Sequence, residues 1–268
     1  MASVTQNSDS SRPETDAFAF VAARALKEIA LRRKMERPSS SEIATQFTDM
    51  MCDNDYVGDD AVAEVLDDEG IAPVFVLDTL IPDVAANIGV QWQTDRMSFA
   101  GVTIVSARLQ SLAWKYIDTY RDMADQQLDA PRILMTTPVG ETHTLGAVLA
   151  LGRFARLGCQ VRAAFDCPPR DLAEIIRTGH FDMIALSASA SADCEQLESL
   201  ITHIRKDRHA PPIALGGSFV ADRPTRARDL GADVVGSEVA AALDIIRASH
   251  HPKASSRADE QNHHKPAE

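Results

Sequence analysis

The spacing of apolar residues divides this 268-residue chain into a helical first half and a mixed second half. Before residue 131, apolar and charged positions recur at the three- and four-residue intervals of amphipathic helices, with Ser, Asp, Pro or Gly near the segment ends. The pattern predicts a bundle of four or five helices. Their expected ranges are Ala17–Arg37, Ser41–Met51, Gly58–Leu66, Pro73–Gly89 and Ser98–Met123.

From Arg132 onward, short apolar runs alternate with helical stretches. Runs that are too short and too apolar to alternate are typical of strands buried on both faces, which indicates a parallel sheet covered by crossover helices. The expected strands are Ile133–Thr136, Val161–Phe165, Met183–Leu186, Ile213–Leu215 and Val234–Val235. The expected helices are Leu145–Leu157, Leu172–Thr178, Asp193–Arg208, Arg226–Leu230 and Ala240–Ala248. In such sheets, ligands bind beyond the carboxyl ends of the strands.

The composition adds limits on organisation and setting. Residues 1–15 and 250–268 are polar and nearly free of apolar side chains, so we expect disordered tails around a helical domain, 16–128, and an α/β domain, 131–249. Four cysteines without a CxxC pair argue against a zinc site or a disulfide framework. The start lacks signal-peptide character, and no apolar run approaches a membrane span. We therefore expect a cytoplasmic protein that binds no membrane.

The net charge of −12 argues against a general nucleic-acid binder. The excess is local, because residues 38–95 contain 13 acidic residues and no Lys or Arg. We expect this acidic segment to favour a basic partner over a phosphate backbone.

The loop after the first expected strand carries the clearest chemistry. Glu141 and His143 precede a helix start that contains Gly146. An imidazole here can ligate a metal, and a carboxylate two residues away can fix its tautomer. By itself this pattern also fits a solvated loop histidine.

Two later motifs make the pattern more specific. Forty residues separate Gly146 from Ser187-Ala188-Ser189, and 26 residues then precede Gly216-Gly217. This chain therefore resembles the cobalamin-binding domain family, whose signature is Asp-x-His-x-x-Gly, Ser-x-Leu and Gly-Gly at similar spacing. The resemblance covers most of residues 131–248. It implies a flavodoxin-like, Rossmann-like five-stranded domain preceded by a helical cap.

The resemblance also implies roles for the motif residues. His143 would be the lower cobalt ligand, Glu141 its hydrogen-bonded partner, and Ser187 a partner of the displaced benzimidazole. Gly146, Gly216 and Gly217 would clear the slot for the nucleotide tail. Two residues depart from the pattern: Glu141 replaces Asp, adding a methylene that could displace the carboxylate, and Ser189 replaces Leu, removing apolar contact from the slot. Both departures permit weaker binding.

The segment before the sheet resembles the helical cap of methionine synthase, corrinoid methyltransfer proteins and light-sensing repressors. In that cap an aromatic residue covers the upper cobalt face, and the resemblance assigns this role to Trp92. The alternative is that Trp92 is an ordinary residue of the bundle core. Light-sensing repressors that hold adenosylcobalamin carry Glu-His ten and eleven residues later, where this chain has Val102 and Thr103. We therefore expect the aquo or hydroxo form to be favoured.

These resemblances converge on the AerR/PpaA type of anti-repressor. The implied protein is no enzyme: it binds cobalamin, responds to light and relieves a DNA-binding repressor of photosynthesis genes by protein contact. Direct DNA contact is left open. One alternative is a corrinoid carrier of a methyltransferase system. Another is a haem-binding redox or light sensor of the same fold, since histidine also ligates haem iron.

Overall fold

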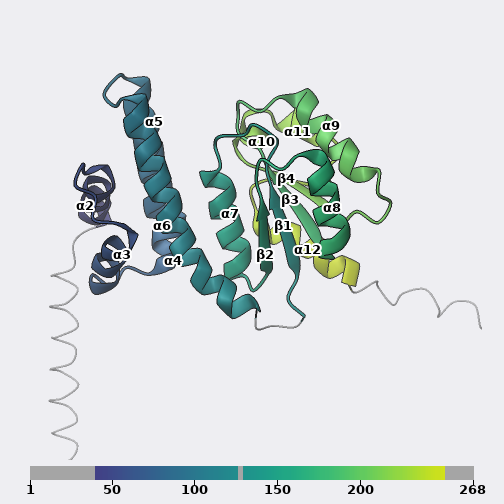
Figure 1. Cartoon of the computed structure of the whole chain (residues 1–268), viewed down its shortest axis with the longest axis horizontal. Coiled ribbons are helices and arrows are strands. Elements are labelled where there is room, and N and C mark those ends of the chain that lie inside the picture. Colours follow the sequence, from purple (N-terminus) through teal and green to yellow (C-terminus); the bar gives the residue numbers. More distant parts are fainter. Residues whose placement is uncertain (1–39, 126–128, 251–268) are drawn as a thin grey trace, which may run out of the picture.

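The computed structural model describes residues 40–125 and 129–250 (Figure 1). The expected helix Ala17–Arg37 and the expected tail 1–15 lie outside these ranges. So does the expected tail 250–268 except for His250, which is the last residue of α12 and not part of a tail. The helical part runs through α2 (Ser40–Cys52), α3 (Asp59–Asp68), α4 (Pro73–Phe75), the π-helical turn η1 (Val76–Leu80), α5 (Ile81–Gln93) and α6 (Phe99–Asp125).

The second part alternates strands and helices as expected. Its strands are β1 (Arg132–Thr136), β2 (Gln160–Ala164), β3 (Met183–Ser187), β4 (Ile213–Gly216) and β5 (Val234–Val235). Its helices are α7 (Leu145–Arg156), α8 (Pro169–Gly179), α9 (Cys194–Arg205), α10 (Ser218–Asp222), α11 (Pro224–Asp229) and α12 (Val239–His250). Within the described residues, the strands form one parallel sheet in the order β2-β1-β3-β4-β5. This order confirms the flavodoxin-like fold class and reverses direction between β1 and β3.

Alternate residues of each strand supply the two faces of the sheet. Ile133 and Met135 of β1 belong to the core shared with α6, α7 and α12, whereas Leu134 belongs to the core under α8, α9 and α11. Both faces are therefore buried, which explains why the strands read as continuous apolar runs. Figure 1 shows α7 between the sheet and the α5–α6 hairpin.

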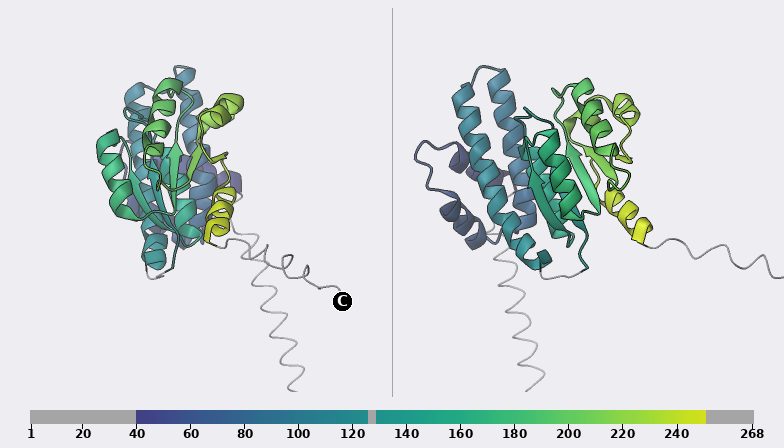
Figure 2. Two further views of the ribbon diagram at one scale, coloured as in Figure 1. Left: turned by 90° about the vertical axis from the view of Figure 1, so that its right-hand side faces the viewer. Right: turned by 45° about the vertical axis from the view of Figure 1, so that its right-hand side comes forward.

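The helical part packs closely against α7. Gly152 makes this approach feasible, because a Cβ at that position would lie 2.7 Å from Cγ1 of Ile117 on α6. Apolar residues of α5 and α6 belong to the same buried cluster as those of α7 and β1. The cap and one face of the sheet thus share a continuous core. The right-hand view of Figure 2 shows the blue cap helices beside the green α/β part.

Two helical segments differ from expectation in more than the positions of their ends. The expected helix Arg226–Leu230 is preceded by the separate short helix α10, and Pro224 begins α11. The expected helix Pro73–Gly89 continues to Gln93 and contains the π-helical turn. Pro82 follows that turn and has no N–H for the carbonyl of Asp78, which favours a local change in helix geometry.

The same helix corrects the expectation that no segment could span a membrane. By length and composition, Pro73–Gln93 is the one described segment that could cross a bilayer. A core helix meets the same criterion, and Leu80, Ile81 and Ile88 are indeed fully buried in the shared core. Asp78 on this helix also forms ion pairs with α7.

Candidate functional site

The loop between β1 and α7 lies at the point where the strand order reverses. Its first turn spans Pro138 to Glu141, whose N–H donates to the Pro138 carbonyl at 3.2 Å. Gly140 sits in this turn with φ of +80°, a conformation that a side chain would disfavour. The turn directs Glu141 back toward the sheet and leaves His143 near the edge formed by the carboxyl ends of the strands.

Glu141 and His143 form a hydrogen-bonded pair. Glu141 Oε1 lies 3.1 Å from His143 Nδ1 and accepts the His143 backbone N–H at 2.8 Å. Its other oxygen accepts the backbone N–H of Ser189 at 3.0 Å, which joins the loops after β1 and β3. The added methylene of Glu therefore leaves the carboxylate in contact with the imidazole. A carboxylate at Nδ1 favours the tautomer whose Nε2 lone pair is free to bind a metal.

The two side chains differ sharply in exposure. The side chain of Glu141 is 5% exposed, whereas that of His143 is 69% exposed. Burial alone would raise the pKa of Glu141, but the hydrogen bonds from His143 and Ser189 outweigh it and hold the pKa below its usual value. The pair thus combines a fixed anion with an accessible imidazole.

Side chains from three other elements fix this loop, and the sequence patterns did not identify them. Asp166, after β2, accepts the Gly140 N–H at 2.7 Å and has a positive φ of 50°. Gln196 of α9 donates to the Val139 carbonyl at 2.8 Å. On the cap side, the Thr144 hydroxyl donates to Gln110 of α6 at 3.1 Å. The loop is therefore held by both the α/β domain and the cap.

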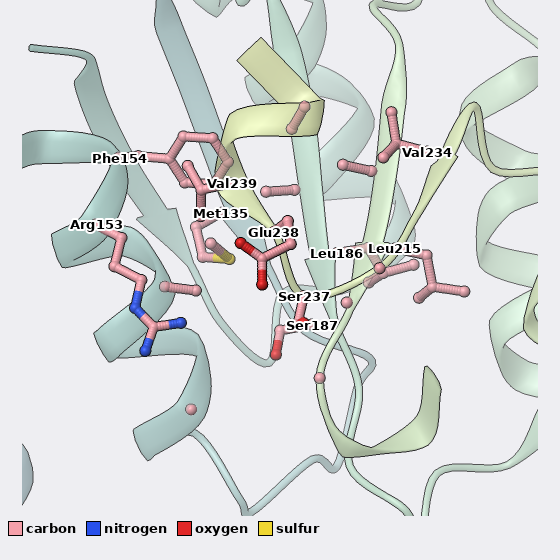
Figure 3. A pocket seen from close by; sticks show the side chains of 18 residues that line it. Met135, Arg153, Phe154, Leu186, Ser187, Leu215, Val234, Ser237, Glu238 and Val239 are labelled. Carbon is pink, nitrogen blue, oxygen red and sulfur yellow. The ribbon is translucent and has the colours of Figure 1, made fainter. Parts of the chain in front are cut away.

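A cavity of about 160 Å³, which we call the slot, lies beside this loop between α7, the sheet and the start of α12 (Figure 3). Four of the predicted site residues line it: Gly146, Ser187, Gly216 and Gly217. Its walls are mainly apolar. A cavity of this size admits an aromatic ring.

Glycines leave room along the slot. A Cβ at Gly146 would meet no atom within 4 Å, so the first turn of α7 presents open space. A Cβ at Gly217 would lie 2.2 Å from the carbonyl oxygen of Ala188, and the φ of Gly217 is +91°. Gly217 is therefore required by the backbone itself, whereas Gly146 is not.

The remaining predicted residues lie elsewhere. Ser189 is nearly buried and does not line the slot; its hydroxyl lies 2.8 Å from that of Ser191. Trp92 ends α5 and is 50% exposed, at the hairpin tip on the same end of the molecule as the His143 loop (Figure 1). Val102 packs against the shared core, and the Thr103 hydroxyl donates to the Phe99 carbonyl at 2.9 Å.

This geometry suits one kind of ligand. A single accessible imidazole can complete the coordination of a metal that a macrocycle already holds. No group of three or more His, Cys, Asp or Glu able to hold a metal occurs within residues 40–125 and 129–250. The adjacent slot can receive a planar group attached to the same ligand.

Comparison with known proteins agrees with this arrangement. Residues 131–247 match the model of the B12 binding domain. An uncharacterized 20.5 kDa protein in the bchF-crtJ intergenic region of Rhodobacter capsulatus is 32% identical over 163 residues, which are 59% of this chain and 83% of that protein. The monomethylamine corrinoid protein of Methanosarcina barkeri has a similar fold, with a TM-score of 0.61 and 14% identity over 77% of this chain and 98% of that one. Residues 131–247 of this chain thus belong to the B12-binding domain family.

Proposed function

We propose that this chain binds cobalamin, with His143 as the lower cobalt ligand and the nucleotide tail of the cofactor in the slot. The observation that carries the proposal is the exposed imidazole, held by a buried carboxylate, directly beside a cavity that Gly146 leaves open. When bound, cobalamin supplies a cobalt centre whose upper ligand can exchange or be released by light. The chain's own contribution is to hold the imidazole tautomer and to accept the tail.

The aquo or hydroxo form is the proposed cofactor state. Val102 has no polar group, and the Thr103 hydroxyl already donates within α6. Neither side chain offers a free hydrogen-bond donor to an adenosyl ligand. The half-exposed side chain of Trp92 at the hairpin tip would cover the upper face of the cofactor. A small upper ligand would leave room for it.

We further propose that the protein acts as a transcriptional regulator of the AerR/PpaA type rather than as an enzyme. The relative from Rhodobacter capsulatus is encoded in a photosynthesis-gene region, which supports a role in controlling such genes. The partner would be a DNA-binding repressor that the protein relieves by direct contact when light or cofactor supply changes the cap.

An acidic surface on the cap supports a basic partner. Figure 1 places α2 and α3 on the side of α6 away from the sheet. Exposed carboxylates on these helices and their flanking loops include Glu42, Asp49, Asp53, Asp55, Asp60, Glu64, Asp67, Asp68 and Glu69. Of these, Asp60 is paired with Lys115. A positively charged repressor surface would be attracted here without blocking the slot.

Absorption spectra test the cofactor. Wild-type protein and His143→Ala are mixed with hydroxocobalamin or adenosylcobalamin, in light and in darkness, and freed of unbound cofactor. We expect wild type to retain corrin bands, with tighter binding of the hydroxo form, and His143→Ala to lose affinity. A Soret band in protein purified from its host would favour haem instead, and absence of any cofactor would refute the site.

Binding to the photosynthesis-gene repressor of the same genome tests the regulatory role. We expect cobalamin-dependent binding that weakens as salt rises, because the attraction between exposed charges is screened. Binding that is unchanged by salt would refute the electrostatic part. Transfer of a methyl group from the loaded protein to a partner enzyme would favour the corrinoid carrier.

A further inference from the structure

Two charged side chains line the otherwise apolar slot, and neither belongs to the motifs of the sequence. Arg153 belongs to the last turn of α7, and Glu238 is the residue before α12 (Figure 3). Figure 3 shows Arg153 on α7 and Glu238 beside the start of α12, both lining the cavity. The apolar walls suit the planar base of a nucleotide, whereas the charged groups beside them can bind polar groups of the same ligand.

Arg153 is held by the cap. Its Nε donates to Asp78 of the π-helical turn at 3.1 Å. Within the part of the chain that the structure describes, this contact holds the Arg153 side chain in place. A guanidinium has five N–H donors, so the Nε contact leaves the terminal nitrogens for another acceptor. Arg156, one turn later on α7, pairs with the other oxygen of Asp78 at 2.8 Å but does not line the slot.

Glu238 complements Arg153 chemically. Glu238 is exposed and directly precedes Val239, the first residue of α12, where the helix dipole favours a carboxylate. A carboxylate accepts hydrogen bonds from sugar hydroxyls, and a guanidinium binds phosphate oxygens. A ribosyl phosphate carries both groups next to each other.

We propose that Arg153 and Glu238 bind the ribosyl phosphate of the nucleotide tail, with Arg153 on the phosphate and Glu238 on a ribose hydroxyl. Asp78 is then a positioning residue, because it acts through Arg153. This inference rests on the proposed binding of cobalamin. It also links the slot to the cap, since one guanidinium contacts both the tail and the helix that leads to Trp92.

The test compares two cofactors. Hydroxocobalamin carries the nucleotide tail, whereas diaquacobinamide has the same corrin ring without it, and absorption titration gives the dissociation constant of each. We expect Arg153→Gln to weaken cobalamin binding by about 10- to 100-fold, the size of a lost charge-assisted hydrogen bond, and to leave cobinamide binding nearly unchanged. Glu238→Ala is expected to have a smaller effect in the same direction.

Arg156→Gln is the matched control, because it also removes an arginine partner of Asp78 but changes a residue that does not line the slot. We expect it to keep the wild-type preference for cobalamin. Asp78→Asn is expected to weaken cobalamin binding in the wild-type background but to add little in the Arg153→Gln background, as a positioning role requires. A purely structural role would lower the affinity for both cofactors alike in all these variants.

Two results would overturn the inference. Equal losses for Arg153→Gln and Arg156→Gln would show that the pairing with Asp78 only supports the fold. An unchanged preference for cobalamin in Arg153→Gln would show that the tail does not contact this residue. If wild type bound neither cofactor, the proposed function itself would fail. If wild type bound cobalamin and Arg153→Gln bound it with the same preference, only the role of Arg153 would fail.

Discussion

Replacing Glu141 by Gln should weaken cofactor binding and destabilise the loop that carries His143. The carboxylate accepts three hydrogen bonds, from the N–H and Nδ1 of His143 and from the N–H of Ser189. A Gln side chain has one carbonyl oxygen, so its amide group must face a donor on one side. A buried donor left without an acceptor costs about 1–3 kcal/mol, and the charge assistance is lost as well. We expect the free energy of unfolding to fall by about 2–3 kcal/mol.

Glu141→Gln should also weaken cofactor binding, beyond any effect of its lower stability. Loss of the group that orients a metal-bound histidine typically reduces metal affinity by about 10- to 100-fold. We expect this loss for hydroxocobalamin, measured by absorption titration at a temperature where the variant is still folded. Urea unfolding followed by circular dichroism gives the stability. Glu174→Gln is the control, since Glu174 is an exposed residue on α8 whose carboxylate pairs with Arg177.

The same residue predicts a dependence on pH. The folded-state pKa of Glu141 lies below its usual value, so its contribution is present at neutral pH and is lost as pH falls below about 4.5. Wild type should therefore lose more stability between pH 7 and pH 4 than Glu141→Gln does. Wild-type affinity and stability in Glu141→Gln would refute the assigned role of the carboxylate.

Three further variants test other parts of the structure. Gly217→Ala forces a side chain into a positive φ and against the Ala188 carbonyl, and we expect a loss of about 2 kcal/mol or more in urea unfolding. Gly146→Ala meets no protein atom, so its stability should change by no more than about 1 kcal/mol, while cobalamin titration should show weaker binding because the methyl group enters the open space of the slot. The double variant Val102→Glu, Thr103→His should raise the affinity for adenosylcobalamin relative to hydroxocobalamin, and an unchanged ratio would contradict the assigned role of these positions.

The fold followed closely from the sequence because its signals are local. Strand β5 matches its expected range, and the other strands differ from theirs by one residue at one or both ends. Apolar runs between helical stretches indicate buried parallel strands whatever their order in the sheet. The motif spacing then located Gly146, Ser187, Gly216 and Gly217, which do lie along one cavity.

The missing parts depend on contacts between distant segments. Asp166 and Gln196 fix the His143 loop from elements 26 and 57 residues away from their partners, and no periodicity marks such residues. Arg153 reads as an ordinary charged position of α7, and only the packing of the cap brings Asp78 to it across 75 residues. The place of Ser189 also needed the structure, because the resemblance to the family motif put this position at the slot, whereas its N–H binds Glu141 and the residue does not line the cavity.

The central claim is that His143 ligates the cobalt, and electron paramagnetic resonance tests it most directly. Protein reconstituted with cobalamin is reduced to the paramagnetic cobalt(II) form, with histidine of natural isotope content or with histidine carrying the heavy nitrogen isotope. We predict that each cobalt line splits into three with natural histidine and into two with the labelled residue, and that His143→Ala loses this change. Splitting that ignores the label would show that the cofactor keeps its own base as the lower ligand and would contradict the account.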